Sequence, residues 1–165
     1  MTINEKEINK LANVPTFIFD LDGTLADISK RLEISNRSGS MDWGEFFNPD
    51  NIHWDEPKQS VIDMTHLLPH QIVIFSGRAD TTRKETLLWL AEQDVRFDAI
   101  LMRPMDTDEF TNDAVLKERW LNQLVDGKLG GKITTIKGVF DDRNQVVKMW
   151  RDKGLTCFQV AEGNF

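Results

Sequence analysis

The sequence predicts an α/β fold with a mainly parallel sheet, helices on both faces and one small inserted cap. Two observations support this prediction. Short apolar runs alternate with stretches of helical periodicity, and a single segment, 27–56, interrupts the alternation. Strands that alternate with helices form parallel sheets covered by helices on both faces. With 165 residues the chain can build one full core, so we expect residues 1–165 to form a single domain.

Apolar runs of strand length predict strands at 16–19, 71–75, 99–102, 137–140 and 156–160. Amphipathic stretches predict helices at 58–68, 81–94, 113–125 and 144–153, and a short helix is expected before Pro15. Local signals support three of the helices. Thr82 and Glu85 form a possible capping box, with Leu87, Leu90 and Ala91 on one face of the same helix. Leu116, Trp120 and Leu124 recur every four residues, and Gly154 follows the last helix.

The segment 27–56 is too long for an ordinary connection and contains Gly, Ser and Asn in its middle. Loops of this length in compact domains are usually lids or binding loops, so we interpret it as a cap inserted after the first strand. It also contains the aromatic residues Trp43, Phe46, Phe47 and Trp54. These side chains have two open roles: they anchor the insert to the body, or they form the underside of a lid or a stacking platform for a base.

Composition limits the partners and the compartment. The net charge of −7 disfavours a long nucleic-acid footprint, which needs a basic stripe, but allows a few local cations to capture one phosphate. No apolar run approaches the length of a membrane span, and the first residues are polar, so we expect no membrane partner and no secretory signal. The only cysteine, Cys157, fits a reducing cytoplasm and lies in an apolar run typical of a core.

The most informative motif follows the first predicted strand. Asp20 and Asp22 come at its carboxyl end, followed by Gly23 and Thr24. Open α/β sheets bind their ligands at this edge. Two carboxylates this close repel each other unless a metal or a substrate needs them, so the motif indicates a site rather than a simple turn.

A second polar motif follows the strand predicted at 71–75. Ser76, Gly77 and Arg78 offer a hydroxyl, a backbone that a ligand can approach closely, and a guanidinium. These three groups at a strand end are typical of a phosphate cradle.

Two further signals complete the set. Lys117 lies near the start of a predicted helix, where a cation opposes the helix macrodipole and is favoured by an anion in front of it. Asp141 and Asp142 form a second acidic pair at a strand end. Oxygen ligands from two acidic pairs suit Mg²⁺, which we expect as the cofactor.

In this order the motifs resemble those of the haloacid dehalogenase superfamily: Asp20-x-Asp22-Gly23-Thr24, Ser76, Lys117 and Asp141-Asp142. The resemblance runs from Phe17 to the C-terminus and implies a Rossmann-like sheet and an aspartyl-phosphate mechanism. Within the superfamily the chain is most similar to the 3′-phosphatase domain of phage polynucleotide kinase-phosphatases, above all at 71–78, 113–117 and 141–165. The sequence has no Gly-x-x-x-x-Gly-Lys-Ser/Thr motif of a kinase.

The resemblance also implies a role for each residue. Asp20 is the expected nucleophile, and Asp22 the general acid and base, with a pKa raised by the charge of Asp20. Asp20 and Asp141 are expected to bind the metal through their side chains and Asp22 through its carbonyl, with Asp142 behind them or holding Lys117. Asp113 is expected in the layer around the site. The expected phosphate-binding residues are Thr24, Arg31 (with Arg37 as the alternative), Ser76, Gly77, Arg78 and Lys117.

The predicted function is a Mg²⁺-dependent phosphomonoesterase that removes 3′-phosphates from nucleic-acid ends or nucleotides. An acid at Asp22 favours ester substrates, because a departing halide needs no proton. One alternative is a nucleoside monophosphate phosphatase. Another is a non-catalytic phospho-acceptor domain, although such receiver domains place their acidic pair and phospho-acceptor in a different order. A separate kinase or ligase is a possible partner.

Overall fold

The computed structural model describes residues 11–128 and 132–165. The short helix expected before Pro15 falls mainly on residues 1–10, outside the described residues. No helix in the described part of the chain combines the length and apolar character needed to cross a bilayer.

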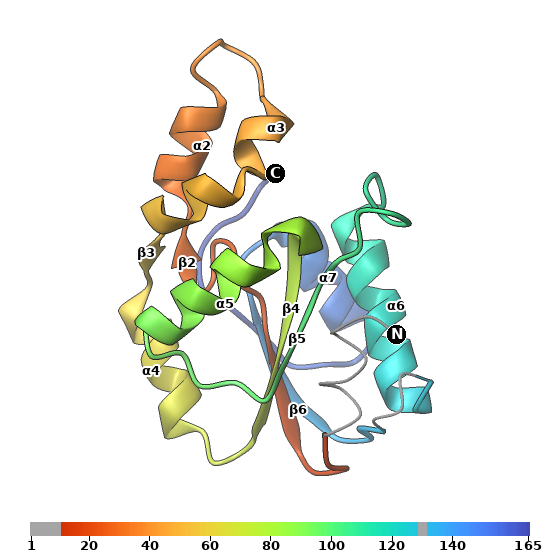
Figure 1. Ribbon diagram of the computed structural model, residues 1–165. Helices are drawn as coiled ribbons and strands as arrows, with labels where there is room; N and C mark the ends of the chain where they lie inside the picture. Colours follow the sequence, from red (N-terminus) through yellow and green to blue (C-terminus); the bar gives the residue numbers. More distant parts are fainter. Residues whose placement is uncertain (1–10, 129–131) are drawn as a thin grey trace.

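The described residues form a parallel sheet of five strands in the order β5-β4-β1-β6-β7 (Figure 1). Its strands are β1 (Thr16–Phe19), β4 (Gln71–Ala79), β5 (Ala99–Arg103), β6 (Ile136–Asp141) and β7 (Cys157–Gln159). The four-residue strand β1 lies in the centre and is entirely buried. The chain adds β4 and β5 on one side of β1 and then returns to place β6 on the other. This arrangement confirms the predicted Rossmann-like fold and creates a topological switch point beside β1.

Helices cover both faces of the sheet. Neighbouring side chains of a strand point to opposite sides, so each strand contributes to the core on both faces. Ile18 and Phe75 face α6 (Asp113–Asp126) and α7 (Asn144–Asp152) in one buried cluster, which also contains Cys157. Phe19 and Ile74 belong to the cluster on the other face, with α4 (Gln59–Leu67) and α5 (Arg83–Glu92). Burial raises the pKa of the Cys157 thiol to about 12, as expected for a core side chain.

The start of α5 differs from the prediction. A 3₁₀ turn, η2 (Asp80–Thr82), precedes the helix, and the Thr82 hydroxyl donates to the carbonyl of Ala79 at 2.8 Å, so the capping box does not form. The predicted buried face is also partly wrong, because Ala91 is exposed while Trp89 and Leu90 are buried. The indole of Trp89 donates to the carbonyl of Asp55 at 2.9 Å, and this contact turns the helix face toward the cap.

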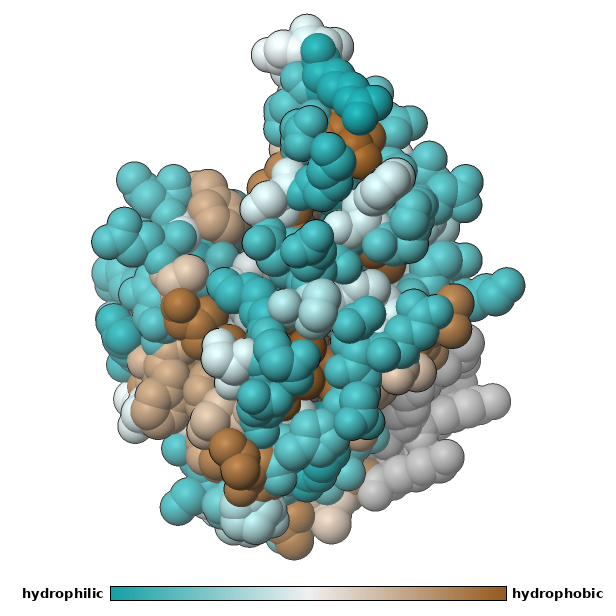
Figure 2. All heavy atoms as spheres, turned by 90° about the vertical axis from the view of Figure 1, so that its left-hand side faces the viewer, coloured by the Kyte–Doolittle hydropathy of each residue, from teal (hydrophilic) through white to brown (hydrophobic). Residues whose placement is uncertain are grey.

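The segment 27–56 folds mainly into short helices that project from the body of the protein (Figures 1 and 2). It contains α2 (Ser29–Ser35), α3 (Trp43–Phe46) and η1 (Pro49–Trp54). Its two ends meet in an antiparallel pair, β2 (Ala26–Asp27) with β3 (Glu56–Pro57). Figure 1 shows α2 and α3 standing above the upper ends of the strands.

Replacing Phe75 by alanine should destabilise the fold strongly. Its ring is fully buried, with centroids 5.5 Å from that of Trp120 and 6.0 Å from that of Trp150. We expect a loss of about 3–5 kcal/mol in the free energy of unfolding, measured by urea denaturation. Val115→Ala on α6, at a side chain that is 52% exposed, should change it by less than about 0.5 kcal/mol. Similar losses in both variants would contradict this description of the core.

Candidate active site

The pairing of β1 with β6 brings the two acidic motifs together. Phe19 pairs with Phe140, and the amide of Asp20 donates to the carbonyl of Phe140 at 2.8 Å. Asp20 follows β1 directly, and Asp141 is the last residue of β6. Because the strands are parallel, both carboxylates emerge at the same edge of the sheet.

The carboxylates of Asp20, Asp141 and Asp142 form a buried acidic cluster. Among the described residues, these three each offer an oxygen within 4.8 Å of the others. The orientation of Asp141 is fixed, because its Oδ1 accepts from the amide of Asp142 at 2.9 Å and its Oδ2 from the indole of Trp150 at 3.1 Å. Three converging carboxylates are a suitable ligand set for a hard divalent cation.

Lys117 extends from α6 into this cluster and is completely buried. Its Nζ lies 2.7 Å from Oδ1 of Asp20, 3.1 Å from Oδ2 of Asp141 and 3.5 Å from Oδ2 of Asp113. Burial by itself would lower the pKa of Lys117, but the neighbouring carboxylates outweigh it and raise the pKa. The ammonium group is therefore charged at neutral pH.

The cluster carries more negative than positive charge. Burial raises the pKa of Asp20, and the charges of Asp141 and Asp142 add to this effect despite the opposing ammonium of Lys117. Burial and the charge of Asp141 likewise raise the pKa of Asp142. One ammonium faces the three carboxylates of the cluster, whereas Asp113 has a second partner in Arg103 at 3.3 Å, so a bound cation would relieve the repulsion within the cluster.

Asp22 points away from the acidic cluster toward two arginines. Its Oδ1 accepts from Nη2 of Arg31 at 2.9 Å and from Nε of Arg78 at 3.1 Å, with a further contact to Nη2 of Arg78. Burial alone would raise the pKa of Asp22, but the two guanidinium groups lower it to about 2. The expected upward shift was therefore wrong, because the arginines, and not Asp20, dominate the surroundings of this side chain.

The two arginines are held in turn by Asp55, a cap residue that the sequence analysis missed. Asp55 accepts from Nε and Nη2 of Arg31 at 3.0 and 2.9 Å, and from Nη2 of Arg78 at 2.8 Å. Arg78 also donates to Thr86 at 3.2 Å, whereas the alternative Arg37 is exposed. No local pattern marks Asp55, because its partners come from α2 and β4. Phosphate binding by Arg31 and Arg78 stays a prediction.

The remaining predicted residues surround the acidic cluster. The Thr24 hydroxyl donates to Oδ2 of Asp20 at 2.9 Å. The Ser76 hydroxyl accepts from the amide of Arg78 at 3.1 Å, which leaves its own proton free to be donated. Gly77 allows a close approach, because a Cβ atom there would lie 2.3 Å from Oδ1 of Asp113. Asp113 therefore lies against Gly77 of the phosphate-cradle motif and also contacts Lys117.

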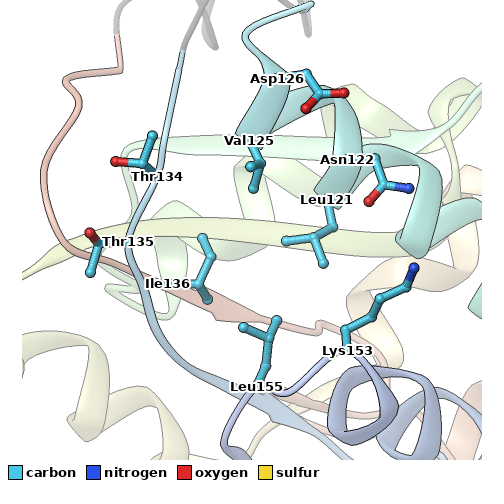
Figure 3. A pocket seen from close by; sticks show the side chains of 9 residues that line it. All are labelled: Leu121, Asn122, Val125, Asp126, Thr134, Thr135, Ile136, Lys153 and Leu155. Atoms are coloured by element: carbon cyan, nitrogen blue, oxygen red, sulfur yellow. The ribbon is translucent and has the colours of Figure 1, made fainter.

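A separate pocket of about 400 Å³ lies at the other end of β6 (Figure 3). Leu121 and Val125 of α6, Ile136 at the start of β6 and Leu155 form much of its wall. The pocket therefore lies at the amino-terminal edge of the sheet, whereas Asp141 ends the same strand at the carboxyl edge. The converging carboxylates, not this pocket, mark the site of chemistry.

Comparison with known proteins agrees with this geometry. The family described as the phosphatase domain of polynucleotide kinase matches residues 14–165. A putative bifunctional polynucleotide kinase/RNA ligase from Autographa californica nuclear polyhedrosis virus is 32% identical over 149 residues, which is 86% of this chain and 19% of the viral protein.

Solved structures show the same relationship. A chain in the Pnkp1/Rnl/Hen1 RNA repair complex is 30% identical, with a TM-score of 0.66 over 92% of this chain and 44% of that one. A haloacid dehalogenase-like hydrolase from Streptococcus pneumoniae shares the fold, with a TM-score of 0.61 at 15% identity over 89% of this chain and 84% of its own. The chain therefore spans less than half the length of the first two relatives.

Replacing Gly23 by alanine should weaken the binding of a divalent cation to the acidic cluster, for which Mg²⁺ is a suitable probe. Gly23 has a φ of +86°, and a Cβ atom there would lie 2.1 Å from Oδ2 of Asp142, so that carboxylate must move. We expect a loss of about tenfold or more in Mg²⁺ affinity, measured by calorimetry on the folded variant.

Gly39→Ala in the cap is the matched control. Gly39 has the same φ of +86° but no atom within 4 Å of the added Cβ, so this variant carries the backbone strain without the collision. Equal Mg²⁺ affinity in the two variants would refute the assigned role of Gly23 beside Asp142.

Proposed function

Because the chain belongs to the family of polynucleotide kinase phosphatase domains, and is thus a phosphatase of the haloacid dehalogenase type, we propose that it removes 3′-phosphates from nucleic-acid ends or nucleotides. One observation carries the proposal for the chemistry: three motifs far apart in sequence, those of Asp20, Lys117 and Asp141, meet at one point. Lys117 contacts both Asp20 and Asp141, and Thr24 contacts Asp20 from the turn after β1.

In the proposed reaction Asp20 attacks the phosphorus atom in line and forms a phospho-aspartate, while the bond from phosphorus to the ester oxygen breaks. Asp22 gives its proton to the departing oxygen and later takes one from the water that hydrolyses the phospho-aspartate. The contacts with Arg31 and Arg78 hold Asp22 ionised, which is the form needed for the second step. An arriving phosphate dianion favours the protonated form needed first, because nearby negative charge raises the pKa of an acid.

The same residues must overcome the repulsion between a carboxylate nucleophile and an anionic substrate. Lys117 supplies a buried positive charge next to Asp20, and the Ser76 hydroxyl keeps a proton for a phosphoryl oxygen. The Thr24 hydroxyl donates to Asp20 and would turn its proton to the phosphoryl group once the substrate binds. Mg²⁺ would be held by Asp20, Asp141 and Asp142 with the carbonyl of Asp22, and when bound it would neutralise charge between nucleophile and substrate. The negative excess of the acidic cluster supports this assignment.

A nucleoside monophosphate is the second candidate substrate. The net charge of −7 favours it, since a protein of this charge gains little from contacts with a long polyanion. The remaining alternative is a non-catalytic phospho-acceptor domain. It would be recognised by a phosphoryl group that stays on Asp20 without turnover.

We also propose that a separate kinase or ligase acts together with this phosphatase. The viral relative is described as a putative bifunctional polynucleotide kinase/RNA ligase, and the match with the present chain covers 19% of its length. The solved relative belongs to an RNA repair complex.

Asp20→Asn should leave the fold intact and lower turnover of a generic aryl phosphate by a factor on the order of a thousand or more, because it removes the nucleophile. Circular dichroism and phosphate release measure the two properties. Asp63→Asn, at an exposed position on α4, is the control and should keep full activity. Comparable turnover by the Asp20 variant would exclude the covalent step, and full activity in chelator-treated solution would exclude the metal.

A substrate panel tests the proposed specificity. We expect a 3′-phosphorylated oligonucleotide and a nucleoside 3′-monophosphate to be hydrolysed faster than a nucleoside 5′-monophosphate, compared by kcat/KM at one salt concentration. The ester oxygen must reach Asp22, and this geometry differs between 3′- and 5′-esters. An oligonucleotide left unprocessed beside a hydrolysed mononucleotide would replace the first candidate by the second.

A further inference from the structure

The cap carries an aromatic surface that the mechanism above does not use. Phe46 is buried and anchors α3, with its ring centroid 4.6 Å from the guanidinium carbon of Arg31. Trp43 and Phe47 lie outside this anchor. Their rings are inclined by only 21°, with centroids 5.9 Å apart, and the side chain of Trp43 is 60% exposed. The Trp43 ring is thus open to solvent on the cap, with the partly buried ring of Phe47 stacked beside it.

Short contacts connect this pair of rings with Asp22. The Trp43 ring meets the Phe46 ring edge to face, with centroids 5.6 Å apart. The carbonyl of Phe46 accepts from Nη1 of Arg31 at 3.3 Å, and Nη2 of the same guanidinium donates to Asp22 at 2.9 Å. Phe46 and Arg31 therefore link the Trp43 ring to Asp22, the proposed acid.

The direction of the reaction places the leaving group on this side of the site. An in-line attack by Asp20 expels the ester oxygen from the opposite side of the phosphorus atom, and Asp22 must reach that oxygen to protonate it. The sugar that carries the oxygen consequently lies beside Asp22, between the acidic cluster and the cap. Figure 1 shows α3 above the strand ends from which Asp20 and Asp141 emerge.

We propose that Trp43 and Phe47 form a stacking platform for the base of the nucleotide that carries the phosphate. The inference rests on the proposed function and names how its substrate is recognised. Every nucleobase has a flat π-face, so stacking accepts all bases and suits an enzyme that processes ends regardless of sequence. The platform also explains why Trp43 stays accessible while Phe46, in the same short helix, is buried against Arg31.

The test compares two oligonucleotides that differ in a single group. Both carry a 3′-phosphate, but one ends in a normal nucleotide and the other in an abasic sugar. Trp43→Ala should lower kcat/KM about tenfold on the first, mainly through KM, and leave the second unchanged. Trp43→Phe should restore most of the loss, because it keeps a flat ring. Titration of the same oligonucleotides against the inactive Asp20→Asn protein, with and without Trp43→Ala, measures the binding difference without catalysis.

Trp54→Ala is the matched control in the same cap. Trp54 is 46% exposed and lies in η1, which packs against α5. Its ring pairs with that of His53, with centroids 4.6 Å apart, and not with the rings of Trp43 and Phe47. This variant should hydrolyse and bind both oligonucleotides as the wild type does.

Several outcomes would overturn the platform. One is a wild type that treats the two oligonucleotides alike, and another is a Trp43→Ala variant that loses activity equally on both, which indicates a structural role. A wild type that hydrolyses an aryl phosphate but neither oligonucleotide would refute the proposed 3′-phosphatase function itself, and the platform with it. Hydrolysis of both oligonucleotides without a base effect refutes the platform alone.

Discussion

The buried ammonium of Lys117 is the contact on which the active site depends. From α6 it reaches Asp20 after β1 and Asp141 at the end of β6, so one charge holds three elements together at the carboxyl edge of the sheet. Without it the acidic cluster would consist of buried carboxylates that repel one another, which costs several kcal/mol. In the proposed reaction the same charge lies where an anionic substrate approaches Asp20, the proposed nucleophile. Stability of the site and its chemistry thus rest on one side chain.

A second set of charges couples the cap to this site. The carboxylates of Asp22 and Asp55 face the guanidinium groups of Arg31 and Arg78. Two negative and two positive charges balance, as expected for a largely buried set. Arg31 and Asp55 belong to the cap, whereas Asp22 and Arg78 belong to the body. Breaking such a buried pair leaves an uncompensated charge, which costs about 3–5 kcal/mol. The position of the cap and the position of the proposed acid are therefore fixed by the same contacts.

The division of labour between sheet and cap follows from this coupling. The edge of the parallel sheet and α6 supply the acidic cluster, Lys117 and the hydroxyls, which suit phosphate esters in general. The cap contributes Arg31, Asp55 and the exposed ring of Trp43, which we propose to lie on the side of the leaving group. A haloacid dehalogenase-like hydrolase with 15% identity shares this fold.

The sequence by itself determined that the acidic motifs lie at the ends of strands, and it identified the residues of the acidic cluster. Asp20 and Asp141 each end an apolar run, and parallel strands carry such residues to one edge whatever the details of packing. Leu116, Trp120 and Leu124 recur every four residues, and this spacing correctly predicted the buried side of α6.

Only the tertiary structure decided whether the pKa of Asp22 is raised or lowered. It also decided the role of Asp55 and the buried face of α5. Each depends on contacts between segments far apart in the chain, such as Arg78 with Asp22 and Trp89 with Asp55. Spacing along the sequence records which side chains a strand or helix turns outward. It does not record which distant charge they meet there, and in a buried site that partner sets the charge state and the orientation.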